Sequence, residues 1–235
     1  MSEFVLPPPP QATLPVAGRT GLFPVNRIFC VGRNYAAHAA EMGNEVDREA
    51  PFYFIKSPAS LAQSGTALPY APGTEDLHHE IEMVVAIGAP GFQVSVEQAP
   101  ALVWGHGTGL DMTRRDLQGA AKARQRPWDL GKDFEGSAVI SALTPGPLPR
   151  PDAAIRLMVN GQTRQDATLA EMVWPVDALI ADLSRFYHLQ PGDLIMTGTP
   201  AGVGPVVPGD RLEGLVEGLE PVRPVSYTHL TLPTS

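Results

Sequence analysis

The chain has 235 residues, a formal net charge of -8 at pH 7 and a single cysteine, Cys30. The acidic balance argues against a nucleic-acid partner, because neutralising phosphates requires clustered Lys and Arg. One cysteine cannot form an intramolecular disulfide, and no secretory signal is evident at the N-terminus. No apolar run approaches the ~20 residues that span a membrane. We therefore expect a cytoplasmic protein with neither a membrane nor a nucleic-acid partner.

Proline and glycine are abundant, with 25 and 23 residues. Turns must therefore be frequent and helices few or short, which indicates a β-rich α+β fold. The length suits one main domain, which we expect over residues 25–225, preceded by a Pro-rich arm at 1–24. Residues 226–235 contain no Asp, Glu, Lys or Arg and are similar to translated sequencing-adapter sequence. We interpret them as a non-native tail.

Hydrophobic periodicity and turn residues predict the elements in chain order. Strands are expected at 27–34, 51–58, 78–88 and 103–113, a hairpin at 155–165, short strands with glycine turns at 191–214, and helices at 35–42, 115–125 and 174–189. Asn34 is expected to cap the first helix, and Asn160-Gly161 to form the turn of the hairpin. In the last helix, Phe186 and Tyr187 are expected to continue the apolar face.

Two glutamates stand two residues apart in the strand expected at 78–88. Residues i and i+2 of a strand point to the same face, so Glu80 and Glu82 project together. Apolar residues continue that face, and two like charges at the edge of a core repel unless a cation joins them. Oxygen ligands favour a hard cation such as Mg²⁺, Mn²⁺ or Ca²⁺, and Asp111 in a Gly-rich strand is the candidate third ligand. The alternative is a solvated polar face.

A histidine and a glutamate share one face of the first expected helix. His38 and Glu41 are three residues apart, which places their side chains together. A carboxylate can orient an imidazole and raise its basicity, so the pair could act as a general base for a water. An exposed ion pair of little energetic consequence is the alternative.

Seven ordered strings resemble the fumarylacetoacetate hydrolase superfamily, and within it the fumarylpyruvate and acylpyruvate hydrolases. They are VGRNYAAHAAEMG (31–43), FIKSP (54–58), LHHEIEMVVAIG (77–88), GLDMTRRDLQ (109–118), RPWDLGKDFEGSA (126–138), VNGQTRQ (159–165) and LIMTGTPAGVGPV (194–206). The resemblance spans roughly residues 22–215. It implies a mixed β-sandwich roll of the family's C-terminal-domain type with a few short helices. It also implies a homodimer that binds one Mg²⁺ or Mn²⁺ per subunit.

Residues of this chain that match the family's motifs are implied to have the family's functional roles. The resemblance implies metal ligands at Glu80, Glu82 and Asp111, and catalytic roles for His38, Glu41 and Lys132. Lys132 lies in the pattern K-x-F-x-x-S, and Thr199 lies in the TGTP loop that receives a substrate carboxylate. Further substrate contacts are implied for Arg33, Arg115 and Gln118.

The function implied by the resemblance is cleavage of a carbon–carbon bond in a small anionic diketo acid. The expected substrate is an acylpyruvate, with fumarylpyruvate first, which would give fumarate and pyruvate in the gentisate pathway of aromatic catabolism. The same superfamily contains oxaloacetate-type decarboxylases and isomerases of 2-hydroxyhepta-2,4-diene-1,7-dioate type, which remain alternatives. A non-catalytic metal- or ligand-binding homologue is the alternative from another class.

Overall fold

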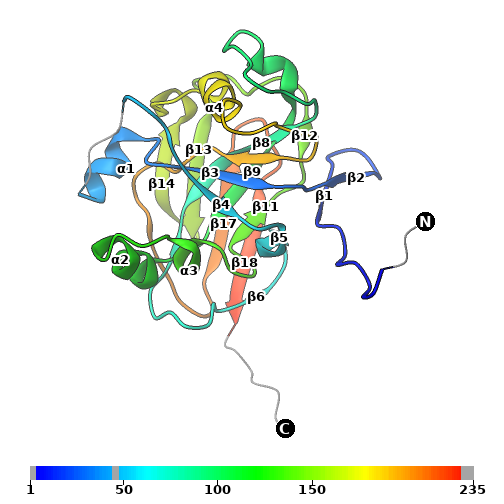
Figure 1. The fold of residues 1–235 in the computed structure, drawn as a ribbon. Coiled ribbons are helices and arrows are strands. Elements are labelled where there is room, and N and C mark those ends of the chain that lie inside the picture. The colour runs from blue at the N-terminus through cyan, green and yellow to red at the C-terminus, as the bar shows by residue number, and fades with distance from the viewer. Residues whose placement is uncertain (1–3, 44–47, 229–235) are drawn as a thin grey trace.

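The protein is described by a computed structural model, which covers residues 4–43 and 48–228 (Figure 1). Its largest sheet has eight strands, and seven of them lie side by side in the order β4 (Phe52–Lys56), β3 (Ile28–Gly32), β15 (Leu194–Met196), β8 (Ile81–Ile87), β9 (Val103–Asp111), β11 (Ala138–Ile140) and β5 (Leu61–Gln63), while β12 (Thr144–Pro145) pairs with β9. Strand β15 runs parallel to β3, and β11 runs parallel to β5, whereas the other pairs are antiparallel. The sheet is therefore mixed.

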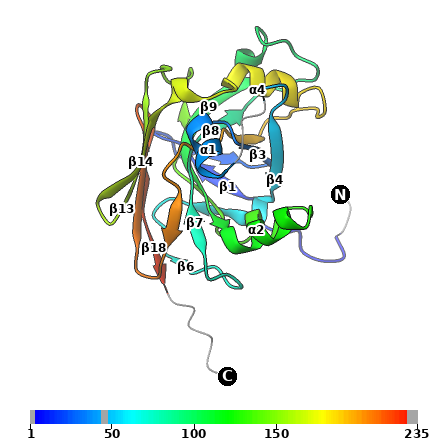
Figure 2. The same cartoon turned by 90° about the vertical axis from the view of Figure 1, so that its left-hand side faces the viewer.

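A second sheet forms one side of the molecule (Figure 2). Its strands, in order, are β14 (Gln162–Thr168), β13 (Ala154–Val159), β17 (Arg211–Val216), β18 (Val222–Thr228) and β6 (Leu68–Pro69). Two small sheets complete the β structure: β10 (Thr113–Arg114), β7 (Leu77–His79) and β16 (Gly204–Val206) form one, and β1 (Thr13–Pro15) and β2 (Leu22–Pro24) form the other.

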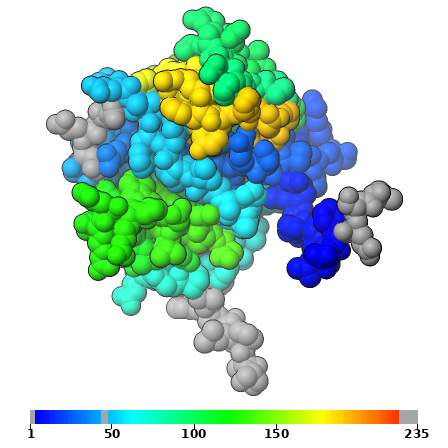
Figure 3. All heavy atoms as spheres, viewed as in Figure 1, coloured from blue at the N-terminus to red at the C-terminus, as the bar shows by residue number. Residues whose placement is uncertain are grey.

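The helices of the described residues are few and short. The α-helices are α1 (Ala36–Glu41), α2 (Arg115–Ala123), α3 (Asp129–Lys132) and α4 (Val176–Leu183), and the 3-10 helices are η1 (Pro58–Ser60), η2 (Ala99–Leu102) and η3 (Leu169–Glu171). Helices α2 and α3, drawn in green, lie together at the surface next to β4 (Figure 3). None of the helices in the described part of the chain has the length and apolar character that crossing a lipid bilayer requires.

Strand β8 lies between two hydrophobic clusters, and all seven of its residues are buried. Its alternate side chains at 81, 83, 85 and 87 join the cluster shared with the second sheet and α4, whereas those at 84 and 86 join the cluster that includes Leu14 and Phe23 of the β1–β2 pair. This two-sided burial follows from the period of two in a strand. The predicted β-rich α+β fold with mixed sheets and few helices is confirmed.

Most of the predicted elements are present, with two differences in detail. The hairpin is confirmed, and Asn160 and Gly161 turn it with φ angles of 53° and 77°. The strand expected at 78–88 is divided at Glu80 into β7 and β8. The last predicted helix ends at Leu183, because the chain turns away there, and Phe186 is 65% exposed rather than part of an apolar face.

The two chain ends were predicted to lie outside the main domain, and that division stays a prediction. In the structure, β1 and β2 pair with each other and place Leu14 and Phe23 in the core, while Phe4, Val5 and Leu6 are exposed. At the other end, the first three residues of the predicted tail continue β18, which pairs with β17 and β6. The rest of that tail, 229–235, lies outside the described residues.

Candidate active site

Three buried carboxylates meet where β8 begins and β9 ends. Glu80 lies in the break before β8, Glu82 is the second residue of β8, and Asp111 is the last residue of β9. The antiparallel register pairs Glu82 with Gly109, and the backbone N–H of Asp111 donates to the carbonyl of Glu80 at 2.8 Å. One oxygen from each carboxylate lies within 4.8 Å of the others. Pairing of the two strands therefore assembles the triad predicted from the sequence.

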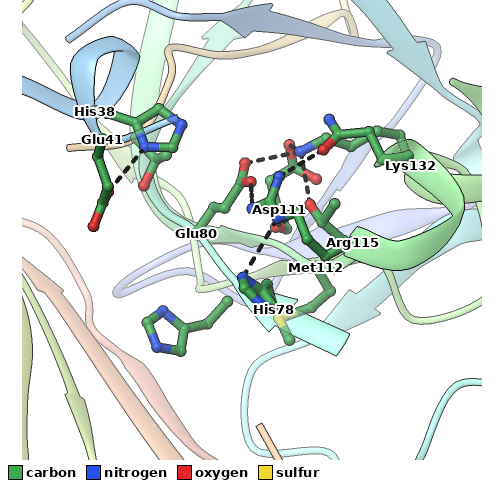
Figure 4. Close-up of polar contacts among 12 residues, drawn as sticks. His38, Glu41, His78, Glu80, Asp111, Met112, Arg115 and Lys132 are labelled. Atoms are coloured by element: carbon green, nitrogen blue, oxygen red, sulfur yellow. Dashed lines mark hydrogen bonds and ion pairs between the residues drawn. The ribbon is translucent and has the colours of Figure 1, made fainter. Parts of the chain in front are cut away.

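Lys132, at the end of α3, reaches two of these carboxylates (Figure 4). Its Nζ donates to Oε2 of Glu80 at 2.8 Å, to Oδ2 of Asp111 at 2.7 Å and to Oγ1 of Thr113 at 2.7 Å. Burial disfavours its cation, but the charges of Asp111 and Glu80 outweigh that effect and raise the pKa of Lys132 above its ordinary value. Lys132 is therefore a permanent cation in contact with the triad.

A second buried lysine, Lys56 at the end of β4, was not singled out by the sequence analysis. Its Nζ lies 2.9 Å from Oδ1 of Asp111, donates to the carbonyl of Met112 at 3.3 Å and also donates to the carbonyl of Lys132. The side chain is fully buried. The sequence could have indicated Lys56, because this lysine ends the apolar run FYFIK and a buried lysine requires an anionic partner.

Arg115 provides the third cation. It forms an ion pair with Glu80, donates to Oε1 of Gln118 at 2.6 Å and approaches Nδ1 of His78 at 3.4 Å. Burial acts to raise the pKa of Glu80, but the charges of Lys132 and Arg115 outweigh it and hold that pKa below the ordinary value. Glu80 is therefore ionised at neutral pH.

Glu82 differs from its two neighbours, because it forms no ion pair with any lysine or arginine of the described residues. Its Oε2 accepts the backbone N–H of Gly198 at 2.8 Å. Burial, together with the charges of Asp111 and Glu80, raises the pKa of Glu82 well above its ordinary value. A further cation beside Glu82 would relieve this repulsion, and three oxygen donors at this separation suit a hard divalent ion.

The TGTP loop at 197–200 is held against β8. Thr197 donates to the carbonyl of Met83 through both its N–H and its Oγ1, each at 3.0 Å. Gly198 has φ of +95°, and a Cβ there would lie 2.7 Å from the Cβ of Asn34, so glycine is required. This close approach brings the N–H of Gly198 to Glu82.

Asn34 supports the same loop and does not cap α1. Its side-chain amide donates to the carbonyls of Thr197 at 2.8 Å and Trp174 at 3.0 Å, and it accepts the N–H of Trp174 at 2.7 Å. The residue before α1 is Tyr35, and no side chain caps the helix. The capping prediction was wrong because these long-range bonds use the whole Asn34 side chain.

His38 and Glu41 lie on α1 at the edge of the site (Figure 4), with Nδ1 of His38 3.5 Å from Oε2 of Glu41. Glu41 also accepts the N–H of Gly202 at 3.1 and 3.2 Å, which ties α1 to the segment after the TGTP loop. Burial lowers the pKa of His38 and outweighs the raising effects of Glu80 and Glu41. His38 is therefore neutral at pH 7 and able to accept a proton.

One cavity joins these groups. Of the ten site residues predicted from the sequence, nine line it: Arg33, His38, Glu80, Glu82, Asp111, Arg115, Gln118, Lys132 and Thr199. Glu41 does not line the cavity but lies next to His38, which does. Arg33 has φ of +58°, a conformation that non-glycine residues rarely adopt and that is often found at functional sites. Phe54 and Trp128 also line the cavity and were not predicted. The individual roles of all these residues stay predictions.

The family model described as fumarylacetoacetate (FAA) hydrolase C-terminal matches residues 27–224. The chain belongs to this family, as its motifs predicted. The fumarylpyruvate hydrolase of Ralstonia sp is 53% identical over 182 residues, which cover 76% of this chain and 94% of the relative. The oxaloacetate tautomerase YcgM of Escherichia coli (strain K12) is 39% identical over 199 residues, covering 83% of this chain and 90% of the relative.

The solved structures include a similar protein with ligands. The crystal structure of fumarylpyruvate hydrolase from Pseudomonas aeruginosa, in complex with Mn²⁺ and pyruvate, superposes with a TM-score of 0.91 at 42% sequence identity. The match covers 97% of this chain and all of that one. The fold is therefore shared over almost the full length of both proteins.

The buried contact between Lys56 and Asp111 predicts a large loss of stability in the variant Lys56→Met. Removing Lys56 leaves Lys132 as the one cation paired with Asp111 among the described residues, in a buried cluster of three carboxylates, so we expect the free energy of unfolding to fall by about 3 kcal/mol. Chemical denaturation in the presence of EDTA measures it. Lys122→Met is the control, because Lys122 is only half-buried, and it should cost less than about 1 kcal/mol. Equal stability of the two variants would contradict the role of Lys56.

Proposed function

We propose that the chain is a divalent-cation-dependent hydrolase that cleaves acylpyruvates, with fumarylpyruvate as substrate. One observation carries the proposal: His38 lines the same cavity as three buried carboxylates, two of which form ion pairs with Lys56, Arg115 and Lys132. The names of the relatives from Ralstonia sp and Pseudomonas aeruginosa support the choice of substrate.

The charge of the site suits a dianionic substrate. When Glu80, Glu82 and Asp111 are all ionised, as they would be around a bound ion, Lys56, Arg115 and Lys132 balance them and these six side chains sum to zero. A bound divalent ion would raise that sum to +2, which matches the two carboxylates of fumarylpyruvate. Electrostatic attraction would then favour the doubly charged diketo acid over neutral ketones.

Glu80, Glu82 and Asp111 would hold Mg²⁺ or Mn²⁺, one ion per chain. The choice rests on the all-oxygen donor set and on the Mn²⁺ of the similar Pseudomonas aeruginosa structure. When bound, the ion supplies Lewis-acid stabilisation of negative charge on the substrate oxygens. Glu82 would lose its proton on binding, because a ligand carboxylate must be ionised.

His38 would activate the water. Its Nδ1 faces Glu41, which orients the ring and stabilises the imidazolium form, while burial keeps the ring neutral before reaction. The opposite nitrogen, Nε2, would accept a proton from a water molecule, and the resulting hydroxide would add to the C4 carbonyl of the diketo acid. The backbone N–H of Gly202 donates to both carboxylate oxygens of Glu41 and would hold Glu41 in place to orient His38.

Collapse of the adduct breaks the C3–C4 bond. The electron pair of that bond moves toward the C2 oxygen, so pyruvate leaves as its enolate and fumarate is the acid product. The proton held on His38 then returns to C3, which balances the addition of one water. Lys132 would offset negative charge that develops on oxygen during these steps.

Four further side chains would bind the substrate. Arg33, Arg115, Gln118 and Thr199 line the cavity around the carboxylate cluster. The two arginines would form ion pairs with the substrate carboxylates, and Thr199 would donate its hydroxyl to one of them. The homodimer, the cytoplasmic location and the gentisate pathway stay predictions.

Oxaloacetate tautomerisation is the second candidate, because relatives with that name are 39% identical over most of this chain. Fumarylpyruvate cleavage is favoured by the higher identity to the Ralstonia sp relative. Incubation with oxaloacetate and with fumarylpyruvate distinguishes the two reactions.

Product analysis tests the reaction itself. With Mn²⁺ or Mg²⁺ we expect equal amounts of fumarate and pyruvate from fumarylpyruvate, and loss of that activity in excess EDTA with recovery on adding the ion back. Chromatography of the products and the decline of the diketo-acid absorbance measure both. Full activity in EDTA, or turnover of oxaloacetate alone, would contradict the proposal.

The role of His38 predicts a large kinetic effect. In His38→Ala, kcat should fall by roughly 100-fold or more, because general bases contribute roughly 10²–10⁴-fold. His188→Ala is the matched control, since His188 is exposed and stacks on Phe92, and it should keep wild-type kcat. A His38→Ala variant that retained more than about a tenth of the activity would exclude water activation by this residue.

A further inference from the structure

Gln165, on β14 of the second sheet, is a fully buried polar residue whose side chain reaches the site. Its Oε1 accepts the backbone N–H of Ile81 at 3.0 Å and faces Nδ1 of His79 at 3.1 Å. Its Nε2 donates to Oγ1 of Thr199 and to the carbonyl of Pro200, each at 2.8 Å. Both the oxygen and the nitrogen of the side-chain amide are therefore hydrogen-bonded.

Two backbone groups determine which way this amide points. The N–H of Ile81 can only donate, so it requires the oxygen of Gln165, and the carbonyl of Pro200 can only accept, so it requires the nitrogen. The opposite orientation would leave both backbone groups without a partner. The direction of the bond to Thr199 follows: Gln165 donates and the hydroxyl oxygen accepts.

This direction controls the proton of Thr199. Because Oγ1 already accepts from Gln165, the hydroxyl remains free to donate its own proton. Thr199 lines the cavity that contains the carboxylate cluster. Its hydroxyl is thereby prepared as a donor for an oxygen of a bound anion.

The oxygen of the amide contacts the two residues that flank Glu80. These residues are His79 and Ile81, and the chain passes here from β7 of one sheet to β8 of another. One oxygen of Gln165 thus holds both neighbours of a carboxylate of the triad. The same side chain connects the break at Glu80 with the TGTP loop.

We propose that Gln165 is a positioning residue, which orients the Thr199 hydroxyl as a donor to the substrate carboxylate and ties the TGTP loop to the break at Glu80. The proposal rests on the proposed function, since it requires an anionic substrate in this cavity. A residue needed only for packing could be apolar here, whereas each of the four bonds depends on the amide.

The test compares Gln165→Met with wild type in Mn²⁺-loaded protein, with pyruvate as the probe. Methionine keeps the length and neutrality of the side chain but removes its donors and acceptor. Calorimetric titration should give about tenfold weaker pyruvate binding, since hydrogen bonds to charged groups are the stronger class. KM for fumarylpyruvate should rise by a similar factor, with a smaller change in kcat. Gln162→Met, on the same strand but exposed, should match wild type.

A double-mutant cycle separates positioning from a purely structural effect. Thr199→Val alone should weaken pyruvate binding, and adding Gln165→Met to it should cost clearly less than the tenfold that Gln165→Met costs alone, because the Thr199 hydroxyl carries part of its effect. Fully multiplicative losses would overturn the proposal. Unchanged pyruvate affinity in folded Gln165→Met would also overturn it. Unchanged affinity in Thr199→Val would instead contradict the proposed role of Thr199 in substrate binding.

A second measurement applies if Gln165→Met does not fold. The side-chain amide protons of Gln165 can be followed by NMR in the Mg²⁺-loaded protein. In Thr199→Val one of the two amide protons should lose its hydrogen-bond shift while the other, bound to the Pro200 carbonyl, keeps it. An unchanged amide spectrum would show that Gln165 does not donate to Thr199 and would overturn the proposal.

Discussion

The balance of buried charge at the ends of β8 and β9 is the constraint on which the rest of the site depends. Three carboxylates lie close enough to repel one another strongly in a region removed from water. Lys56 and Lys132 offset this repulsion at Asp111, and Lys132 with Arg115 offsets it at Glu80. Glu82 has no such cation among the described residues. These cations therefore stabilise the cluster without a metal ion, and the carboxylate of Glu82 remains available as a ligand for one.

The two packed sheets explain how this cluster is kept in place. Strand β8 is buried on both faces, so the position of Glu82 is determined by core packing. The TGTP loop adds the N–H of Gly198, and Gln165 reaches in from the second sheet. Catalytic side chains held by rigid strands and by their own hydrogen bonds need little reorganisation when a substrate binds. Helix α1, which Glu41 ties to the segment after that loop, brings His38 to the cavity.

Local patterns predicted the fold class, the hairpin and the carboxylate pair, because these features depend on residues close in sequence. Long-range partners were harder to predict. Lys56 meets Asp111, 55 positions later, and Gln165 meets Ile81 across two sheets. Asn34 fitted a helix cap locally, yet its amide bonds to Thr197 and Trp174. In each case the partner lies far along the chain, so the fold decides which group satisfies the polar side chain.

The most direct test of this account is a calorimetric titration of Mn²⁺ into wild type and Glu82→Gln. Glutamine keeps the shape of Glu82 and can still accept the N–H of Gly198, so the fold should be retained. We predict one ion per wild-type chain and at least roughly 100-fold weaker binding in the variant, since even indirect changes around a metal cost about 10–100-fold. The exposed control Glu97→Gln should bind as wild type does. Wild-type Mn²⁺ affinity in Glu82→Gln would contradict the central claim.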